Sequence, residues 1–227
     1  MGANSSTSSI PSVAADHPGV AELFAVLAYG EISAFYRLAD EAAQLSPTLH
    51  GKVALARMAA SEMRHFERLE RALADRGANV YDAMAPFVRA LDAYHASTTP
   101  STWLESLVKA HVGDGIAADF YREIAGALEP SVAEIVRDVL AETGHSAFVV
   151  DEVNNAVAAS RQGKDRLMLW GRRLLGEAIT QAQHVLAQRD ELMELVITAT
   201  GDLNNVAALF DRMQESHSER MAVLGLV

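Results

Sequence analysis

The sequence predicts an all-α fold, a four-helix bundle followed by additional C-terminal helices. Ala and Leu are abundant, whereas Gly and Pro account for only 14 and 6 of the 227 residues, and this favours helix over sheet. Apolar residues recur at helical spacing through several long segments. The pattern Glu-x-x-His also occurs twice, at Glu62/His65 and at Glu142/His145, and two such pairs are typical of helical bundles that hold two metal ions.

The composition excludes several classes of protein. The net charge of −11 gives no general attraction to nucleic acid or to anionic membranes. Cysteine is absent, which excludes disulfides, thiolate metal sites and cysteine nucleophiles and leaves carboxylate and imidazole as metal ligands. No apolar run approaches the ~20 residues of a membrane span. Residues 1–18 lack the basic start and apolar core of a secretory signal, so we expect a disordered leader on a cytoplasmic protein.

The first two helices are predicted over residues 19–44 and 52–76. Apolar residues recur along both at a spacing of 3.6 residues, and Ser46-Pro47-Thr48 separates them. The stretch that follows contains Pro86 and Pro100 and is expected to hold a short helix that crosses the bundle.

The remaining helices are predicted over residues 103–128, 131–159 and 165–200. Gly201-Asp202 then interrupts the chain before a last amphipathic helix. The expected organisation is therefore a leader over 1–18, a bundle over 19–200 and a C-terminal helix over 201–227.

Two segments of the bundle resemble each other. Residues 30–39 read GEISAFYRLA and residues 113–125 read GDGIAADFYREIA, so each has an acid after Gly and a Phe-Tyr-Arg downstream. This pattern indicates an internal duplication of a helical hairpin and makes Glu31 and Asp114 equivalent.

The candidate metal ligands fall in one layer of the predicted bundle. Glu31 and Glu62 lie about 20 and 15 Å from the turn that joins their helices, and Asp114 and Glu142 lie about 21 and 17 Å from theirs. Each histidine lies one turn after its glutamate, on the same helix face. Four acids and two histidines in an apolar layer need a common partner, because unpaired buried charge is strongly disfavoured. The predicted metal ligands are Glu31, Glu62, His65, Asp114, Glu142 and His145.

Other polar residues have weaker claims. Asp119 is the rival of Asp114, but it lies off the apolar stripe of its helix. We expect His111 to be a buried histidine with its polar atoms satisfied, while Asp138 is either an orienting partner or a surface charge. The remaining residues are expected to pack or to be solvated, namely Tyr36 and Tyr121, the pair Arg172 and Arg173, and the acids Glu22, Glu41, Glu67 and Glu70.

The order of these residues resembles the ferritin-like dimetal-carboxylate superfamily. Within it, the stretches AYGEISAFYRLADEA, SEMRHFERL, HVGDGIAADFYREIA and GRRLLGEAITQAQ are similar to the actinobacterial-type branch of the MiaE-like group, which is named for a tRNA hydroxylase acting on 2-methylthio-isopentenyladenosine. The resemblance implies a ferritin-like four-helix bundle in which Glu62 and Glu142 bridge two metal ions and are the candidate catalytic residues. It implies that Glu31 and Asp114 are terminal ligands, although Asp114 stands where Glu is commoner.

The resemblance also implies chemistry, namely a diiron monooxygenase that activates O2 and hydroxylates an unactivated C–H bond. The cofactor it implies is two iron ions, with manganese as the alternative. Candidate partners are O2, an electron donor, tRNA carrying isopentenylated adenosine, and a second copy of the chain in a homodimer, with no membrane. Two other functions stay open at this point: an iron or manganese oxidase or peroxide-scavenging protein without RNA, and a helical interaction protein with a structural metal site.

Overall fold

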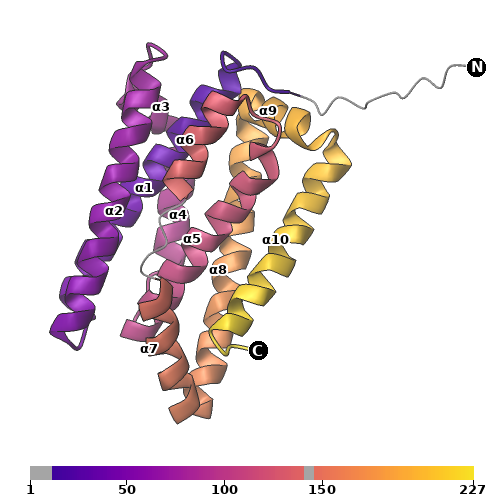
Figure 1. Cartoon of the computed structure of the whole chain (residues 1–227). Coiled ribbons are helices and arrows are strands. Elements are labelled where there is room, and N and C mark those ends of the chain that lie inside the picture. The colour runs from indigo at the N-terminus through magenta and orange to yellow at the C-terminus, as the bar shows by residue number, and fades with distance from the viewer. Residues whose placement is uncertain (1–11, 141–145) are drawn as a thin grey trace, which may run out of the picture.

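The computed structural model describes residues 12–140 and 146–227. Within these residues the chain is helical, and its one β feature is an isolated bridge between Val13 and Leu128. The elements in chain order are α1 (Pro18–Gln44), α2 (Leu49–Ala74), α3 (Val80–Met84), η1 (Ala85–Phe87), α4 (Val88–Ser97), α5 (Trp103–Ala125), α6 (Pro130–Leu140), α7 (Ser146–Ala159), α8 (Arg161–Gln188), α9 (Asp190–Thr200) and α10 (Leu203–Val223). The prediction of an all-α bundle with extra C-terminal helices is confirmed (Figure 1).

Helices α1 and α2 form a long hairpin at one side of the molecule (Figure 1). Its ends are capped locally, because His17 Nδ1 accepts a hydrogen bond from Gly19 N and Thr48 Oγ1 accepts one from Gly51 N, both at 3.0 Å. With Thr48 as its cap, α2 begins at Leu49, three residues before its predicted beginning at residue 52. The hairpin brings the middle of α1 opposite the middle of α2, where Glu31 and Glu62 lie.

Helix α5 runs through the middle of the fold and contacts α1, α6, α7, α8, α9 and α10. Contact on so many sides agrees with its buried residues, which are spread around the helix rather than along a single stripe. It begins at Trp103 as predicted and ends at Ala125, three residues before the predicted end. The predicted helix over 131–159 corresponds to α6 and α7, and residues 141–145 between them lie outside the described part of the chain.

The single helix predicted over 165–200 is wrong, because the chain forms two helices there, α8 and α9. Arg189 separates them with a non-helical backbone (φ −125°, ψ 90°). A side chain of α1 explains the break: Glu22 forms an ion pair with Arg189 and accepts a hydrogen bond from the backbone N of Leu192 at 3.0 Å. Glu22 therefore caps the start of α9 and is not the solvated charge that its position suggested.

Among the described residues, α1 is the one helix that is also long and apolar enough to cross a membrane, by length and composition alone. The core helix of a globular fold has the same composition, and α1 packs against α2, α3 and α9. Its residues Leu23, Phe24 and Leu38 are fully buried in these contacts.

The last helix, α10, lies at the opposite edge of the molecule from α2 (Figure 1). It buries Leu209, Phe210, Met213 and Met221 and packs against α5, α8 and α9. Within the described residues, these side chains belong to the same apolar core as those of α1 and α2. Side chains from before and after the boundary predicted at residue 201 therefore pack into one core.

Candidate metal centre

A cavity of about 670 Å³ lies among the helices. Its volume falls within the usual range for small-molecule sites, and its walls are predominantly aliphatic and aromatic. Most of the helices contribute to it. The apolar side chains in its lining include Leu27, Met58, Leu91, Ile116, Phe120, Val139, Val149, Val185, Leu186, Leu192 and Met213.

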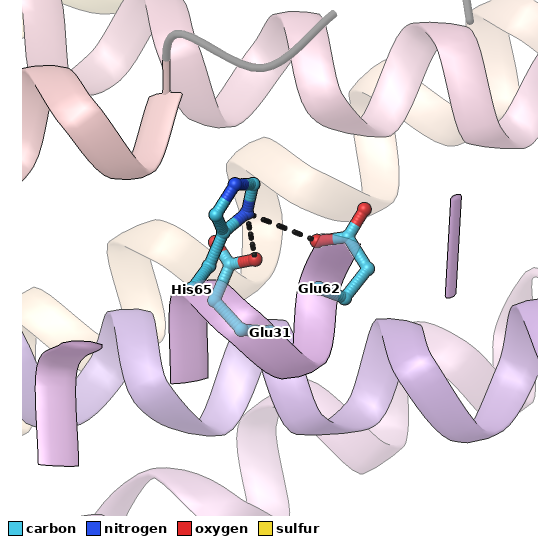
Figure 2. Close-up of side chains that lie close together, drawn as sticks. All are labelled: Glu31, Glu62 and His65. Atoms are coloured by element: carbon cyan, nitrogen blue, oxygen red, sulfur yellow. Dashed lines mark hydrogen bonds and ion pairs between the residues drawn. The ribbon is translucent and has the colours of Figure 1, made fainter. Parts of the chain in front are cut away.

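Glu31, Glu62 and His65 converge on this cavity from α1 and α2. His65 Nδ1 lies 3.1 Å from Glu31 Oε2 and 3.7 Å from Glu62 Oε2. The three side chains point toward one another, as Figure 2 shows, and one ligand atom from each lies within 4.8 Å of the others. They are only 12–13% exposed. The structure thus brings together half of the predicted ligand set.

The electrostatics of this group follow from its burial. Burial, and then the hydrogen bond with Glu62, raise the pKa of Glu31 well above its ordinary value. Burial opposes the charge of Glu62 as well, but its hydrogen bonds with Glu31 and His65 lower its pKa overall. Burial opposes protonation of His65, yet hydrogen bonds with both carboxylates raise its pKa to about 9. Shared protons therefore stabilise the close approach of these three side chains. A divalent cation would neutralise the same carboxylates.

Asp114 and Asp119, the two candidates on α5, have different surroundings. Asp114 lines the cavity with an accessible side chain, although burial and then the Glu62 charge raise its pKa to about 7. Both observations agree if its accessible surface faces the cavity rather than the bulk solvent. Asp119 is 5% exposed and forms ion pairs with Arg122 and Arg220. Its oxygens are engaged by cations, so Asp114 is the better placed candidate for a metal ligand.

The other predicted residues fall in several places. Glu142 and His145 lie outside the described residues, so their place in the ligand set stays a prediction. His111 and Tyr121 line the cavity. The rest are away from it: Tyr36, Arg172 and Arg173 are exposed, and Asp138 forms an ion pair with Arg68.

A polar group in the same cavity as the candidate metal ligands was not predicted. Arg37 and Lys109 line the same cavity, and Glu41, which we expected to be solvated, is 5% exposed and pairs with Arg37 at 3.1 Å. The sequence carries one signal for this group, because Lys109 interrupts the apolar stretch Leu107-Val108-Lys109-Ala110. Charged side chains within a helical apolar stripe indicate buried polar contacts.

The donors that the cavity offers fit a transition-metal centre. Carboxylate oxygens and an imidazole nitrogen are the usual ligands of iron, manganese and zinc where cysteine is absent. Glu31, Glu62 and His65 supply three such atoms at one point, and Asp114 adds a carboxylate in the same cavity. Two metal ions need further ligands than these four.

The sequence is similar to a known protein family over most of its length. A family model described as "Ferritin-like domain, actinomycetes" matches residues 15–199, which include α1 to α9 except the last residue of α9. No curated protein matches the sequence.

Proposed function

Because the chain belongs to the ferritin-like domain family of actinomycetes, we propose that it is a diiron, O2-dependent hydroxylase acting on an apolar group. The observation that carries this proposal is the convergence of Glu31, Glu62 and His65 at the wall of a cavity of about 670 Å³ with apolar walls. A metal centre that faces such a space can meet an organic substrate directly.

The proposed metal centre contains two iron ions. Glu31, Glu62, His65, Asp114, Glu142 and His145 would hold them, and the family resemblance implies that Glu62 and Glu142 would each serve both ions. When bound, the iron supplies O2 activation and the redox equivalents that the protein's side chains lack. Manganese in place of iron is the alternative composition of the same ligand set.

The residues of the chain would position the substrate and exclude water. Met58, Ile116 and Phe120 present apolar surface to the cavity in the neighbourhood of the metal ligands. In the overall reaction one oxygen atom of O2 enters the C–H bond and the other leaves as water. This balance requires two protons and two electrons, and the electrons come from a separate reductant.

A narrower form of the proposal names the substrate as isopentenylated adenosine in tRNA. The sequence resemblance to the MiaE-like group suggests it, and an isopentenyl group is apolar enough for the cavity walls. The net charge of −11 weighs against it, because RNA binding depends on neutralising phosphates. Comparison of modified nucleosides in total tRNA from wild-type and deletion cells tests it. Unchanged hydroxylated nucleoside in the deletion strain would remove tRNA as the substrate.

The metal centre is tested by elemental analysis. Protein produced with iron available should contain close to two equivalents of metal. Glu62→Ala should lose most of both, because a bridging carboxylate serves both ions. Glu67→Ala is the matched control, since Glu67 is an exposed glutamate on the same helix. Full metal content in Glu62→Ala would refute the assignment.

A second candidate function uses the same ligands without an organic substrate, as an oxidase or peroxide-scavenging protein. The size and the apolar lining of the cavity favour the hydroxylase, because a peroxide needs neither. In either case we propose a cytoplasmic protein, in keeping with the acidic, cysteine-free sequence.

A further inference from the structure

Lys109 is the starting point, because it is a buried cation that the proposed metal centre does not use. The sequence contains three lysines, Lys52, Lys109 and Lys164, and Lys109 is only 1% exposed. Its Nζ donates a hydrogen bond to the backbone O of Thr98 at 2.7 Å and lies 5.4 Å from the centre of the Tyr94 ring. None of the ion pairs among the described residues includes it. An ammonium can donate three hydrogen bonds, so Lys109 has donors to spare.

Arg37 lines the same cavity, close enough for its charge to lower the pKa of Lys109, and it is also incompletely paired. Its Nη1 contacts both carboxylate oxygens of Glu41, at 3.1 and 3.3 Å, but its buried Nε has no hydrogen-bond partner. Glu41 also accepts a hydrogen bond from Ser106 Oγ, which divides its acceptors further. Glu41 thus pairs with Arg37 but forms no ion pair with Lys109.

The two cations occupy a definite level of the fold. On α1, Arg37 lies between Glu31 and Glu41, and on α5, Lys109 lies between Ser106 and Asp114. Arg37 follows Glu31 by six positions and Lys109 precedes Asp114 by five. These offsets correspond to about 9 and 7.5 Å along the helix axes. The cavity therefore has a metal-ligating end and a basic end, which lie one to two helical turns apart.

Two residues of α4 that line the cavity, Tyr94 and His95, add no negative charge to the basic end. Burial, and then the charges of Lys109 and Arg37, lower the pKa of His95 to about 3, so that its imidazole is neutral. Burial raises the pKa of Tyr94 to about 12, so that its phenol is neutral as well. With Lys109 protonated, Arg37 and Lys109 each carry a positive charge, and Glu41 forms its ion pair with that of Arg37.

We propose that this basic end binds the carboxylate of a monoanionic ligand whose apolar chain extends along the cavity toward Glu31, Glu62 and His65. A single carboxylate balances the one surplus positive charge, can replace Thr98 O as the partner of Lys109, and can accept from Arg37 Nε. A phosphate dianion would exceed that charge, and an uncharged isopentenyl group would leave the cations as they are. The carboxylate-binding site does not depend on the metal. The proposal that its ligand is the substrate rests on the proposed hydroxylase function.

The test compares two ligands of equal chain length by calorimetry at pH 7, octanoate and octan-1-ol. Both fill the apolar part of the cavity, but only octanoate offers a charge. Octanoate should bind about tenfold more tightly or better, the usual effect of hydrogen bonds to a charged group. Equal or tighter binding of octan-1-ol to the unmodified protein would overturn the proposal, and this comparison needs no variant.

Variants then locate the site. Lys109→Met should bring the ratio of the two affinities close to one, and Lys109→Arg should restore the preference for octanoate. Lys164→Met, which changes a lysine that does not line the cavity, is the matched control and should leave the ratio unchanged. A preference for octanoate that survives Lys109→Met would place the anion elsewhere and refute the assignment.

Metal depletion separates this proposal from the proposed function. Octanoate should bind the metal-depleted protein with the same preference over octan-1-ol, because Lys109 and Arg37 are not metal ligands. Loss of that preference on depletion would mean that the carboxylate binds to the metal, which overturns the proposed site. Retained binding without hydroxylation of octanoate would support the site and reject only the substrate class.

Discussion

Burial of the Lys109 amine opposes folding at neutral pH. Burial, and then the Arg37 charge, lower its pKa from 10.5 to about 7, while Glu41 acts in the opposite direction. Because the folded pKa lies below the unfolded one, the unfolded chain binds more protons between these values. The stability associated with the neutral amine is therefore fully present above pH 10.5 and is lost as the pH falls to about 7.

A methionine at this position removes that dependence. Lys109→Met should be more stable than the unmodified protein at pH 7, and the difference should shrink toward pH 10. Each pKa unit corresponds to about 1.4 kcal/mol, so a difference of a few kcal/mol is the upper limit. The other titratable groups facing Lys109, namely Tyr94 and His95, have pKa values of about 12 and 3 and do not change charge in this window. Urea unfolding at pH 7 and at pH 10 measures this difference in stability. A difference that does not change with pH would contradict the prediction.

The two aspartates of α5 predict opposite phenotypes. Asp114→Ala should lower the metal content with a small effect on stability, because its carboxylate faces the cavity and forms no ion pair among the described residues. Asp119→Ala should keep the metal and lose about 3–5 kcal/mol of stability, because it leaves the buried Arg220 without its partner. Elemental analysis together with urea unfolding separates the two. An empty metal site in Asp119→Ala alone would mean that the assignments are reversed.

Spacing along the sequence predicted the residues that share a helix face but not those that meet through packing. Glu62 and His65 lie one turn apart on α2, and a hairpin of known length brings Glu31 to the same level. Arg37 and Lys109 lie on helices far apart in the sequence, and whether both line one cavity depends on how α1 and α5 are rotated. A charged residue in a helix is usually solvated, so nothing local distinguished Glu41 from Glu67.

At the scale of elements, the start of α9 depends on a side chain from another helix. Glu22 of α1 accepts from Leu192 N at 3.0 Å and pairs with Arg189. Glu22→Ala removes both contacts and should cost about 1–2 kcal/mol, as the loss of a helix cap does. Hydrogen exchange should quicken mainly in the first turn of α9. Glu191→Ala, which removes an exposed acid from the same turn, is the control and should change little. Unchanged exchange in Glu22→Ala would refute the cap.

This dependence also explains which helix boundaries could be predicted. Proline fixes the start of α1, since Pro18 is its first residue, and Gly201, with φ of 101°, ends α9 where predicted. The break at Arg189 involves neither Gly nor Pro, and the sequence around it continues a helical pattern. Its cause is a contact with α1 across 167 residues of sequence, which no local pattern encodes.

At the scale of the whole molecule, the cavity beside the candidate metal centre is completed by a helix that lies beyond the family match. That match ends at residue 199, yet Met213 and Arg220 of α10 line the cavity. Arg220 pairs with Asp119 of α5, and Gly115 of α5 leaves room for the Arg220 side chain, which a β-carbon there would displace. Helix α10 therefore acts as a wall of the site as well as a cover of the core.

Truncation after Thr200 should accordingly damage both the fold and the cavity. It exposes the apolar surface that Leu209, Phe210 and Met213 bury, and it leaves Asp119 without Arg220. Truncations of such packed segments are poorly tolerated, because tolerance depends on burial rather than on position in the sequence. We expect the 1–200 chain to unfold at a lower temperature and to bind the dye ANS. Adding a peptide of residues 201–227 should reverse both changes, since the lost contacts are noncovalent. A truncated chain with the melting temperature, metal content and octanoate affinity of the full chain would show that α10 is dispensable.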